Sequence, residues 1–190
     1  MTKDYYRKIY KNKRIKLSVQ EREALNKCIY DQLVAMDWNE VRFVHVYISI
    51  IKFNEPDTLD FVSYLKTNYP KINVIVSKTD FVNNIMVNYL WDDKMVLKES
   101  KWGILEPQSG QLIEESKIEV VLVPLLVADL KGNRVGYGKG FYDRFLAKCK
   151  PSVRKIGVSF FDPVEPISDV DEWDISLDVL VTATGLFQFK

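Results

Sequence analysis

The sequence has few of the side chains that carry most metal and nucleophilic chemistry. Among its 190 residues there is one histidine, His45, and there are two isolated cysteines, Cys28 and Cys149. Cysteines without C-x-x-C spacing indicate neither a zinc site nor a disulfide framework, and we expect both thiols to be buried or half-buried on helices. A lone histidine inside an apolar run is expected to be a packed, hydrogen-bonded core residue. Any catalysis must therefore come mainly from positioning and electrostatics.

Long apolar runs and an excess of one charge are also lacking. No apolar stretch approaches the roughly 20 residues that a membrane span requires, and the charged N-terminus has no hydrophobic signal region. The 27 basic and 26 acidic residues give a formal net charge of +1, which provides no general attraction to nucleic acid or to an anionic membrane. The sequence predicts a cytoplasmic monomer without nucleic-acid or membrane partners, in which any anion recognition is local.

The length and the apolar content of 47% fit a single domain over residues 1–190, with no internal repeat and no flexible linker. The expected helices cover 3–16, 18–36, 58–69 and 141–149, and the expected strands cover 41–51, 72–77, 85–91, 119–124, 154–160 and 178–182. A turn at 92–93 is expected to pair 85–91 with 94–98 as a hairpin. The alternation predicts a Rossmann-like three-layer α/β/α sandwich around a mainly parallel sheet, on the scaffold of phosphosugar isomerases and CoA-transferases.

Local signals support several of these elements. Ser18-Val-Gln-Glu21 is a capping-box signature that opens the second helix. The run 41–51 is long, β-branched and apolar, which is typical of a strand buried on both faces of a parallel sheet. Either Asp57 or Thr58 is expected to cap the third helix.

The most informative stretch is Asp129–Arg144, with the sequence DLKGNRVGYGKGFYDR. It follows the apolar run 119–124 and leads into a segment with helical spacing. Gly136, Gly138 and Gly140 stand at alternate positions, where glycine permits positive φ and a close approach of backbone N–H groups to an anion. The pattern predicts a strand, an anion-binding loop and a helix.

Cations surround this predicted loop. Arg134, Lys139 and Arg144 lie in or beside it, where guanidinium and ammonium groups can neutralise phosphate oxygens. The following helix adds unpaired N–H groups and the positive end of its dipole. The spacing matches neither a Walker A loop nor a dinucleotide fingerprint. A tight turn with solvated charges is the alternative, but the combination favours a polyphosphate ligand.

The stretch resembles the signature of the 5-formyltetrahydrofolate cyclo-ligase family, also called methenyltetrahydrofolate synthetase. The matching positions are Pro124, Asp129, Gly132, Arg134, Gly136, Gly138, Gly140, Phe141, Tyr142 and Asp143. The resemblance implies an enzyme that converts 5-formyltetrahydrofolate to 5,10-methenyltetrahydrofolate with ATP and Mg²⁺. A phosphorylated formyl intermediate is implied, with release of ADP and phosphate.

The same resemblance implies an ATP site. In the family an N-terminal Lys-x-x-x-Arg pair reaches the nucleotide phosphates, and Lys3 with Arg7 match it, although a solvated basic helix face is the alternative. The implied ATP-binding residues are Lys3, Arg7, Arg134, Gly136, Tyr137, Gly138, Lys139, Gly140, Phe141 and Tyr142. Of these, Arg134, Lys139 and Tyr142 are assigned to the phosphoryl-transfer step.

The resemblance also implies a folate site. The family pattern Glu-x-x-Thr matches Glu55 and Thr58, and the glutamate there helps to hold the pterin ring. Ile50 aligns with a position that lines the same pocket. Trp102 could stack on the heterocycle, with a core or hinge aromatic as the alternative. Tyr142 is expected to close the pocket between the two substrates.

Two aspartates are the implied magnesium ligands. Asp143 lies in the first turn of the predicted helix, where it could instead compensate the helix dipole. Asp174 aligns with the aspartate of the family's C-terminal His-Asp or Asn-Asp pair. One or two carboxylates are what a magnesium ion needs when phosphates and waters complete its coordination.

Two other function classes remain open from the sequence. Trp173 precedes Asp174 where the resemblance expects His or Asn, and this difference leaves open a catalytically silent module that binds nucleotide or folate. A phosphosugar isomerase or acyl-CoA transferase on a similar scaffold is a further alternative, but the sequence offers no convincing catalytic glutamate motif.

Overall fold

A seven-stranded sheet forms the centre of the computed structural model, which describes residues 1–100 and 103–189. The strand order is β11-β10-β9-β6-β1-β2-β3. Neighbours from β10 to β2 pair in parallel, and the two outermost strands, β11 and β3, pair antiparallel. The strands are β1 (Phe43–His45), β2 (Asn73–Asp80), β3 (Ile85–Leu90), β6 (Val120–Pro124), β9 (Arg154–Val158), β10 (Val179–Val181) and β11 (Leu186–Gln188). The predicted, mainly parallel sheet is confirmed.

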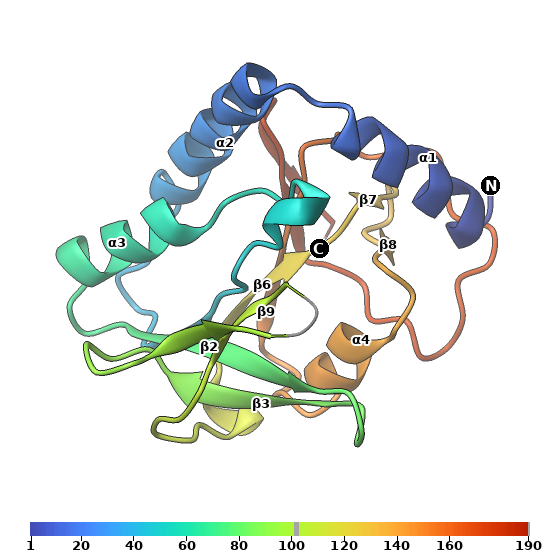
Figure 1. Ribbon diagram of the computed structural model, residues 1–190. Helices are drawn as coiled ribbons and strands as arrows, with labels where there is room; N and C mark the ends of the chain where they lie inside the picture. Colours follow the sequence, from blue (N-terminus) through green and yellow to red (C-terminus); the bar gives the residue numbers. More distant parts are fainter. Residues whose placement is uncertain (101–102, 190) are drawn as a thin grey trace.

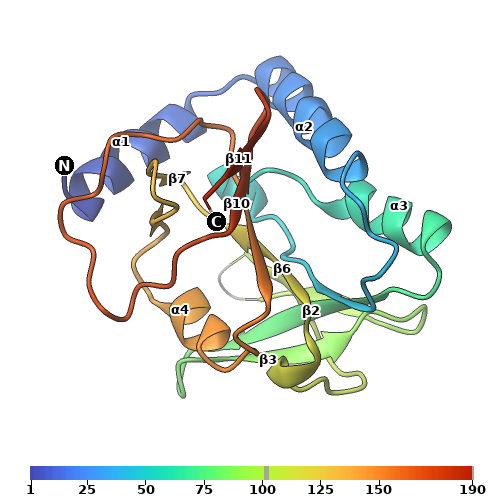
Figure 2. The same ribbon diagram turned by 180° about the vertical axis from the view of Figure 1, so that it is seen from behind.

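Helices lie on both faces of the sheet. The helices are α1 (Lys3–Ile15), α2 (Val19–Val34), α3 (Leu59–Asn68) and α4 (Phe141–Leu146), with single 3-10 turns η1 (Ile51–Phe53) and η2 (Glu115–Lys117). Figures 1 and 2 show α2 and α3 on one side of the sheet and α4 on the other. The predicted sandwich is therefore present, but its second helical layer is thin.

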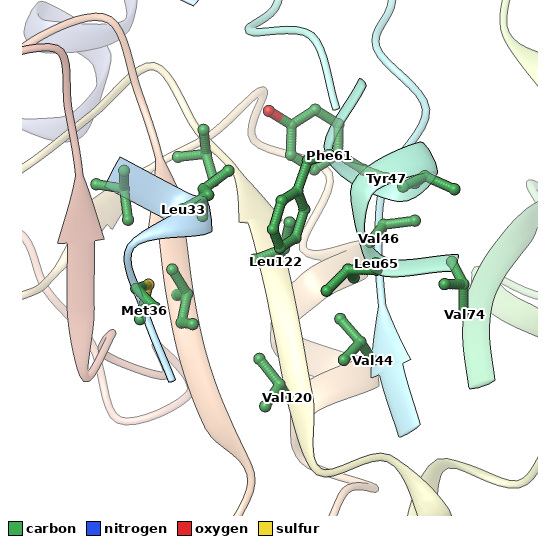
Figure 3. Close-up of a cluster of buried hydrophobic side chains, with 14 of the residues drawn as sticks. Leu33, Met36, Val44, Val46, Tyr47, Phe61, Leu65, Val74, Val120 and Leu122 are labelled. Atoms are coloured by element: carbon green, nitrogen blue, oxygen red, sulfur yellow. The ribbon is translucent and has the colours of Figure 1, made fainter. Parts of the chain in front are cut away.

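The larger part of the core lies between the sheet and the α2/α3 layer (Figure 3). Leu33 from α2 and Phe61 from α3 pack there on Val44 and Leu122. Val121, the β6 residue before Leu122, belongs to the core on the opposite, α4 side of the sheet. This alternation of two apolar faces is why a buried parallel strand reads as a continuous apolar run. No helix among the described residues is long and apolar enough to cross a membrane.

The helix signals are confirmed, although α4 ends at Leu146 rather than at residue 149, and Cys28 is exposed where a buried or half-buried thiol was expected. Ser18 Oγ accepts from the Glu21 amide, and the Glu21 carboxylate accepts from the Ser18 amide, which completes the predicted capping box. Thr58 is the residue before α3, but its hydroxyl donates to the Tyr47 carbonyl. The Asp57 carboxylate accepts from the amide of Leu59 instead.

Two strand predictions are wrong in extent or pairing. The run 41–51 forms only β1, because after Val46 the chain leaves the sheet and turns through η1, where Ile51 is 75% exposed. The predicted pairing of 85–91 with 94–98 does not form. Instead, β3 pairs with β2 across a turn in which Asp80 accepts from two amides, those of Val82 and Asn83.

Five further strands were not predicted with these bounds. The edge strand β11 is one. Two others, β4 (Leu97–Glu99) and β5 (Leu105–Pro107), pair with each other. The last element is a ribbon of β7 (Val127–Ala128) with β8 (Arg134–Val135), which divides the predicted loop at a turn.

That turn is organised by Asp129, a fully buried signature residue. Its carboxylate accepts from the amides of Lys131, Asn133 and Ile167, and from the Asn133 side chain. The aspartate therefore has a structural role. The glycine-rich segment after β8 is a separate short loop, residues 136–140, that connects β8 to α4. This loop, α1 and the segment after β1 together form the candidate site.

Candidate functional site

The loop of residues 136–140 joins β8 to α4 and lies against α1. Gly138 has φ +83°, and a Cβ there would lie 3.2 Å from the Arg7 guanidinium carbon. Gly140 has φ +65° and is the N-cap of α4. Gly136 does not adopt positive φ, so that part of the prediction is wrong for it. Its carbonyl instead accepts from Arg7 Nε at 3.0 Å, which ties the loop to α1.

Five charged residues beside this loop form what we call the glycine-loop cluster: Lys3, Arg7, Arg134, Asp143 and Asp174. Arg134 Nη2 donates to Asp143 Oδ1 at 2.5 Å, and the amide of Ile175 donates to the same oxygen at 3.2 Å. Lys3 Nζ pairs with Asp174 Oδ2. Burial lowers the pKa of Arg134, while the neighbouring Asp143 and Asp174 oppose that shift. The cluster therefore brings together residues from α1, β8, α4 and the segment before β10.

The two aspartates of this cluster have the donor set that magnesium accepts. Among the described residues, Asp143 accepts hydrogen bonds only through Oδ1 and Asp174 only through Oδ2. Each carboxylate thus keeps one oxygen for another ligand. Over the same part of the chain, no group of three or more His, Cys, Asp or Glu side chains could hold a metal by itself. Phosphate and water would have to supply the remaining ligands, as Mg²⁺ usually requires.

The other two loop cations behave differently from each other. The Lys139 side chain is exposed, and its position in the loop leaves it available to an anion. Arg144 lies beside the loop as expected, but it donates to the carbonyls of Lys139 and Asn84, both at 2.9 Å. Its guanidinium carbon also lies 5.2 Å from the centre of the Phe141 ring. Arg144 therefore holds the loop together through neutral partners.

A second group, which we call the Glu55 cluster, consists of Arg14, Glu55 and Tyr137. Glu55 is 7% exposed, and its Oε2 accepts from the amide of Ile50 at 2.8 Å. Its Oε1 accepts from Tyr137 Oη at 2.8 Å, and that hydroxyl accepts from Arg14 Nη2. Burial raises the pKa of Glu55, while the Ile50 amide, the Arg14 charge and the Tyr137 hydroxyl oppose the shift.

Tyr142 lies between the two clusters. Burial raises the pKa of its hydroxyl well above the usual value, the Glu55 charge adds to this rise, and the Arg134 charge opposes it. Its ring packs at 6.1 Å from the ring of His45, edge to face. The phenol is therefore neutral and is positioned next to groups from both predicted substrate sites.

His45 is fully buried beneath α4, as expected for a packed histidine. Its Nε2 lies 2.8 Å from Ser77 Oγ, which donates to Asn88 Oδ1 at 2.7 Å. Desolvation lowers the pKa of His45 to about 3. The neutral ring packs at 4.8 Å from Phe145, which is the position of a core side chain.

The remaining residues that the sequence analysis singled out differ in whether they contact the two clusters. Ile50 contributes its amide to Glu55, and Phe141 begins α4 with its ring 5.5 Å from that of Phe81. Trp102 lies outside the described residues. Trp173 is 76% exposed, so its side chain projects largely into solvent.

Sequence reasoning missed Arg14, although a signal for it was present. Lys3, Arg7 and Arg14 are spaced by four and seven residues, which places all three on one face of a helix. Tyr137 was placed with the nucleotide residues, but its hydroxyl lies in the Glu55 cluster. The loop thus contributes to both clusters.

Comparisons with known proteins find relatives that match most of the chain. The model of the 5-formyltetrahydrofolate cyclo-ligase family matches residues 1–183. The 5-formyltetrahydrofolate cyclo-ligase of Mycoplasma pneumoniae is 26% identical over 95% of this chain and 98% of its own length. The Escherichia coli K12 protein of the same name is also 26% identical, over 81% of this chain and 86% of its own.

A solved structure extends the similarity to three dimensions. The structure of Aquifex aeolicus 5,10-methenyltetrahydrofolate synthetase matches with a TM-score of 0.83 and 29% identity, over 100% of this chain and 94% of that one. The resemblance drawn from the glycine loop is therefore confirmed over nearly the whole chain. The protein belongs to the 5-formyltetrahydrofolate cyclo-ligase family, whose named relatives are ligases.

Proposed function

We propose that this protein uses MgATP to convert 5-formyltetrahydrofolate to 5,10-methenyltetrahydrofolate, with release of ADP and phosphate. The observation that carries the proposal is the junction of two unlike clusters at one loop. Residues 136–140 have cations and two carboxylates on one side, and on the other they supply Tyr137 to a buried carboxylate. A reaction between a polyphosphate and a heterocycle needs such a pair of neighbouring subsites.

The triphosphate is assigned to the glycine-loop cluster. Lys139, Arg134, Lys3 and Arg7 supply positive charge, and the backbone N–H groups near Gly138 and Gly140 add donors. Arg134 and Lys3 already pair with Asp143 and Asp174. When MgATP binds, phosphate oxygens would replace the carboxylates at the cations, and magnesium would replace the cations at the carboxylates.

The pterin ring is assigned to the Glu55 cluster. A pterin presents adjacent N–H donors on its aminopyrimidinone edge, and a carboxylate accepts such a pair with two oxygens. Both oxygens of Glu55 are already held in place, by Ile50 and Tyr137. Tyr142 would then lie between the ring and the phosphates.

The chemistry requires no covalent protein residue. The formyl oxygen on N5 attacks the γ-phosphorus and ADP leaves, giving an imidate phosphate. N10 then attacks the activated carbon, its proton is lost, and phosphate departs to give the methenyl product. Positioning and charge neutralisation can supply most of the rate enhancement in phosphoryl transfer.

The test is to mix the protein with 5-formyltetrahydrofolate and MgATP and to follow the absorbance of the methenyl product and the release of ADP. Equal amounts of both products are expected, with neither formed when ATP is omitted or when EDTA is present. Tight binding of both ligands without turnover would instead indicate a silent binding module. Conversion of a phosphosugar or an acyl-CoA without ATP would overturn the proposal in favour of an isomerase or transferase.

A further inference from the structure

Arg14 is unusual for an arginine on a surface helix because its side chain is buried. It belongs to the last turn of α1, and only 1% of it is exposed. A buried guanidinium is costly unless its N–H groups and its charge find partners. The other basic residues of that turn and of the following cap, Lys13 and Lys16, are not buried. The burial of Arg14 therefore calls for a specific explanation.

The hydrogen-bond partners of Arg14 lie next to the Glu55 carboxylate or at the end of β6. Nη1 donates to the carbonyl of Leu125 at 3.1 Å, at the end of β6. Nη2 donates to the Tyr137 hydroxyl, and the guanidinium carbon lies 5.5 Å from the centre of the Tyr137 ring. Nε is buried and has no hydrogen-bond partner within the described part of the chain. Arg14 therefore reaches Glu55 through the tyrosine.

The hydroxyl of Tyr137 carries a single proton. Since Arg14 donates to its oxygen, that proton is directed to Glu55 Oε1, 2.8 Å away. The Ile50 amide holds Oε2 in the same way. Both oxygens of the carboxylate are thus oriented, one by backbone and one by a chain that begins at Arg14.

We propose that Arg14 is a positioning residue of the folate site: through the Tyr137 hydroxyl it orients the Glu55 carboxylate that receives the pterin. The proposal rests on the proposed function, because it assumes that Glu55 contacts the folate. It gives α1 two tasks, since Arg7 on the same face holds the carbonyl of Gly136 at the other side of the loop. Helix α1 would then hold both the backbone next to Tyr137, through Arg7, and the Tyr137 hydroxyl, through Arg14.

A second consequence concerns the ionisation of Glu55. The titratable groups that face it are Arg14 from α1, Tyr47 after β1, Tyr137 from the loop and Tyr142 from α4. Arg14 is the cation among them, and its charge opposes the rise in the pKa of Glu55 that burial causes. Without Arg14 that pKa rises further, and folate binding through a carboxylate is lost at a higher pH.

The experiment compares Arg14→Met, Arg14→Lys, Tyr137→Phe and the double variant Arg14→Met/Tyr137→Phe by steady-state kinetics across pH. For Arg14→Met we expect the KM for 5-formyltetrahydrofolate to rise roughly tenfold, with the KM for ATP within about twofold of wild type. The pH below which folate KM increases should move upward. Arg14→Lys should recover part of the loss, because it restores the charge without the fork.

The double variant tests whether the arginine acts through the tyrosine. Adding Arg14→Met to Tyr137→Phe should cost less than it does in the wild type, since the shared hydroxyl is already gone. Equal losses in both backgrounds would overturn the proposal, as would parallel rises in both KM values or an unmoved pH midpoint. If Arg14→Met does not fold, Tyr137→Phe alone decides, because an unchanged folate KM in that variant would also overturn it.

A matched control is available on the same helix. Tyr6 is 5% exposed and donates to the carbonyl of Glu165 at 3.0 Å, a residue of neither cluster. Tyr6→Phe also removes one buried hydrogen bond of α1, and it should leave the folate KM and its pH dependence unchanged. Absence of methenyl product with the wild-type protein would reject the proposed function itself, which is a different outcome from a functional wild type with insensitive variants.

Discussion

The glycine-loop cluster and the Glu55 cluster contain the same kinds of groups in opposite arrangements. In the first, cations and carboxylates pair directly, and the paired side chains of Lys3, Asp174 and Asp143 remain 17%, 22% and 29% exposed, although that of Arg134 is only 7% exposed. In the second, a carboxylate and a guanidinium that are almost fully buried are joined by a tyrosine hydroxyl. Direct pairs near the surface can exchange partners at little cost, whereas a buried chain of hydrogen bonds keeps one geometry.

This difference suits two different ligands. A triphosphate with magnesium brings both signs of charge, so it can replace both members of each direct pair. A pterin brings N–H donors and a flat ring, so it needs a carboxylate that is already oriented and desolvated. The loop of residues 136–140 separates the two environments and contributes to each.

The largest effect is expected in the buried cluster. Glu55→Gln replaces one acceptor oxygen with a donor amide next to the Ile50 amide and the Tyr137 hydroxyl. We expect kcat/KM for 5-formyltetrahydrofolate to fall about 100-fold, or about 3 kcal/mol, with little change in the KM for ATP. Steady-state kinetics with each substrate varied would measure both effects.

A matched control for that variant lies at the other end of the sheet. The Glu119 carboxylate accepts from the amides of Arg42 and Phe43 at 2.5 and 3.1 Å. Glu119→Gln should change stability but not the folate KM. A fall of less than threefold for Glu55→Gln would show that the buried carboxylate does not hold the substrate.

Next in size is the effect of Lys139→Ala on the nucleotide side. The exposed ammonium is assigned to the triphosphate, and a hydrogen bond to a charged group contributes about 1.5–3 kcal/mol. The KM for ATP should therefore rise by between 10-fold and 100-fold, roughly, while the folate KM stays within about twofold. Lys131→Ala, which removes an exposed lysine from the nearby turn, is the control for general loss of charge. The reverse pattern, a folate defect with normal ATP use, would contradict the division of the site.

The sequence predicted the two clusters unequally, for a physical reason. Anion binding by the loop was predicted from Gly136, Gly138, Gly140 and the adjacent cations, because backbone conformation and charge are local properties of the chain, although Gly136 does not adopt positive φ. The other residues of the glycine-loop cluster that lie far from the loop in sequence, Lys3, Arg7 and Asp174, were predicted only through the family resemblance. Arg14 and Tyr137 meet Glu55 across long sequence separations, and only the packing of α1 on the loop brings them together.

The same limit applies to the fold. Continuous apolar runs predicted the inner parallel strands, since burial on both faces leaves a strong compositional signal. The pairing of β3 with β2 depends on a turn organised by Asp80, while the Asp92-Asp93 signal marks a turn that does not form the expected hairpin. Composition predicts that a segment is buried, but it does not specify the partner strand or where a buried run leaves the sheet, as it does after β1.

The buried His45 should make the free energy of unfolding depend on pH. Because its pKa is lowered to about 3, the folded state does not bind the proton that the unfolded chain binds below its usual pKa of about 6.5. The stability contributed by the neutral ring is complete above roughly pH 7 and is lost as the pH falls. Between pH 7.5 and pH 5, about 2 kcal/mol of unfolding free energy should disappear.

Urea unfolding at a series of pH values would measure this loss. The chain has one histidine, so a His45→Gln variant carries no histidine and should lose much less stability over the same interval. The raised pKa of Glu55 acts in the opposite direction, and it is common to both proteins. Parallel pH curves for the two proteins would mean that the ring is hydrated or already charged in the folded state.

A smaller effect is expected for Asp143→Asn. The variant keeps one oxygen but removes a negative charge from the candidate magnesium site, where phosphates would hold most of the ion. We expect the half-saturating concentration of Mg²⁺ to rise about fivefold, or about 1 kcal/mol, with a nearly normal rate at saturating metal. Titration of activity with Mg²⁺ at fixed ATP would show this, and an unaltered titration would leave Asp143 only the task of pairing with Arg134.

The smallest effect is expected for Trp173→Ala, even though this residue is the one that raised the alternative of a silent module. The residue is 76% exposed, and its amide donates to the Asp171 carboxylate at 2.9 Å, a contact that alanine keeps. Surface substitutions of this kind usually change stability by less than about 0.5 kcal/mol. Activity and the Mg²⁺ titration should therefore stay within about twofold of wild type. A larger loss in Trp173→Ala would mean that the ring folds over a bound substrate, and the segment before β10 would then have to be counted with the clusters that hold the ligands.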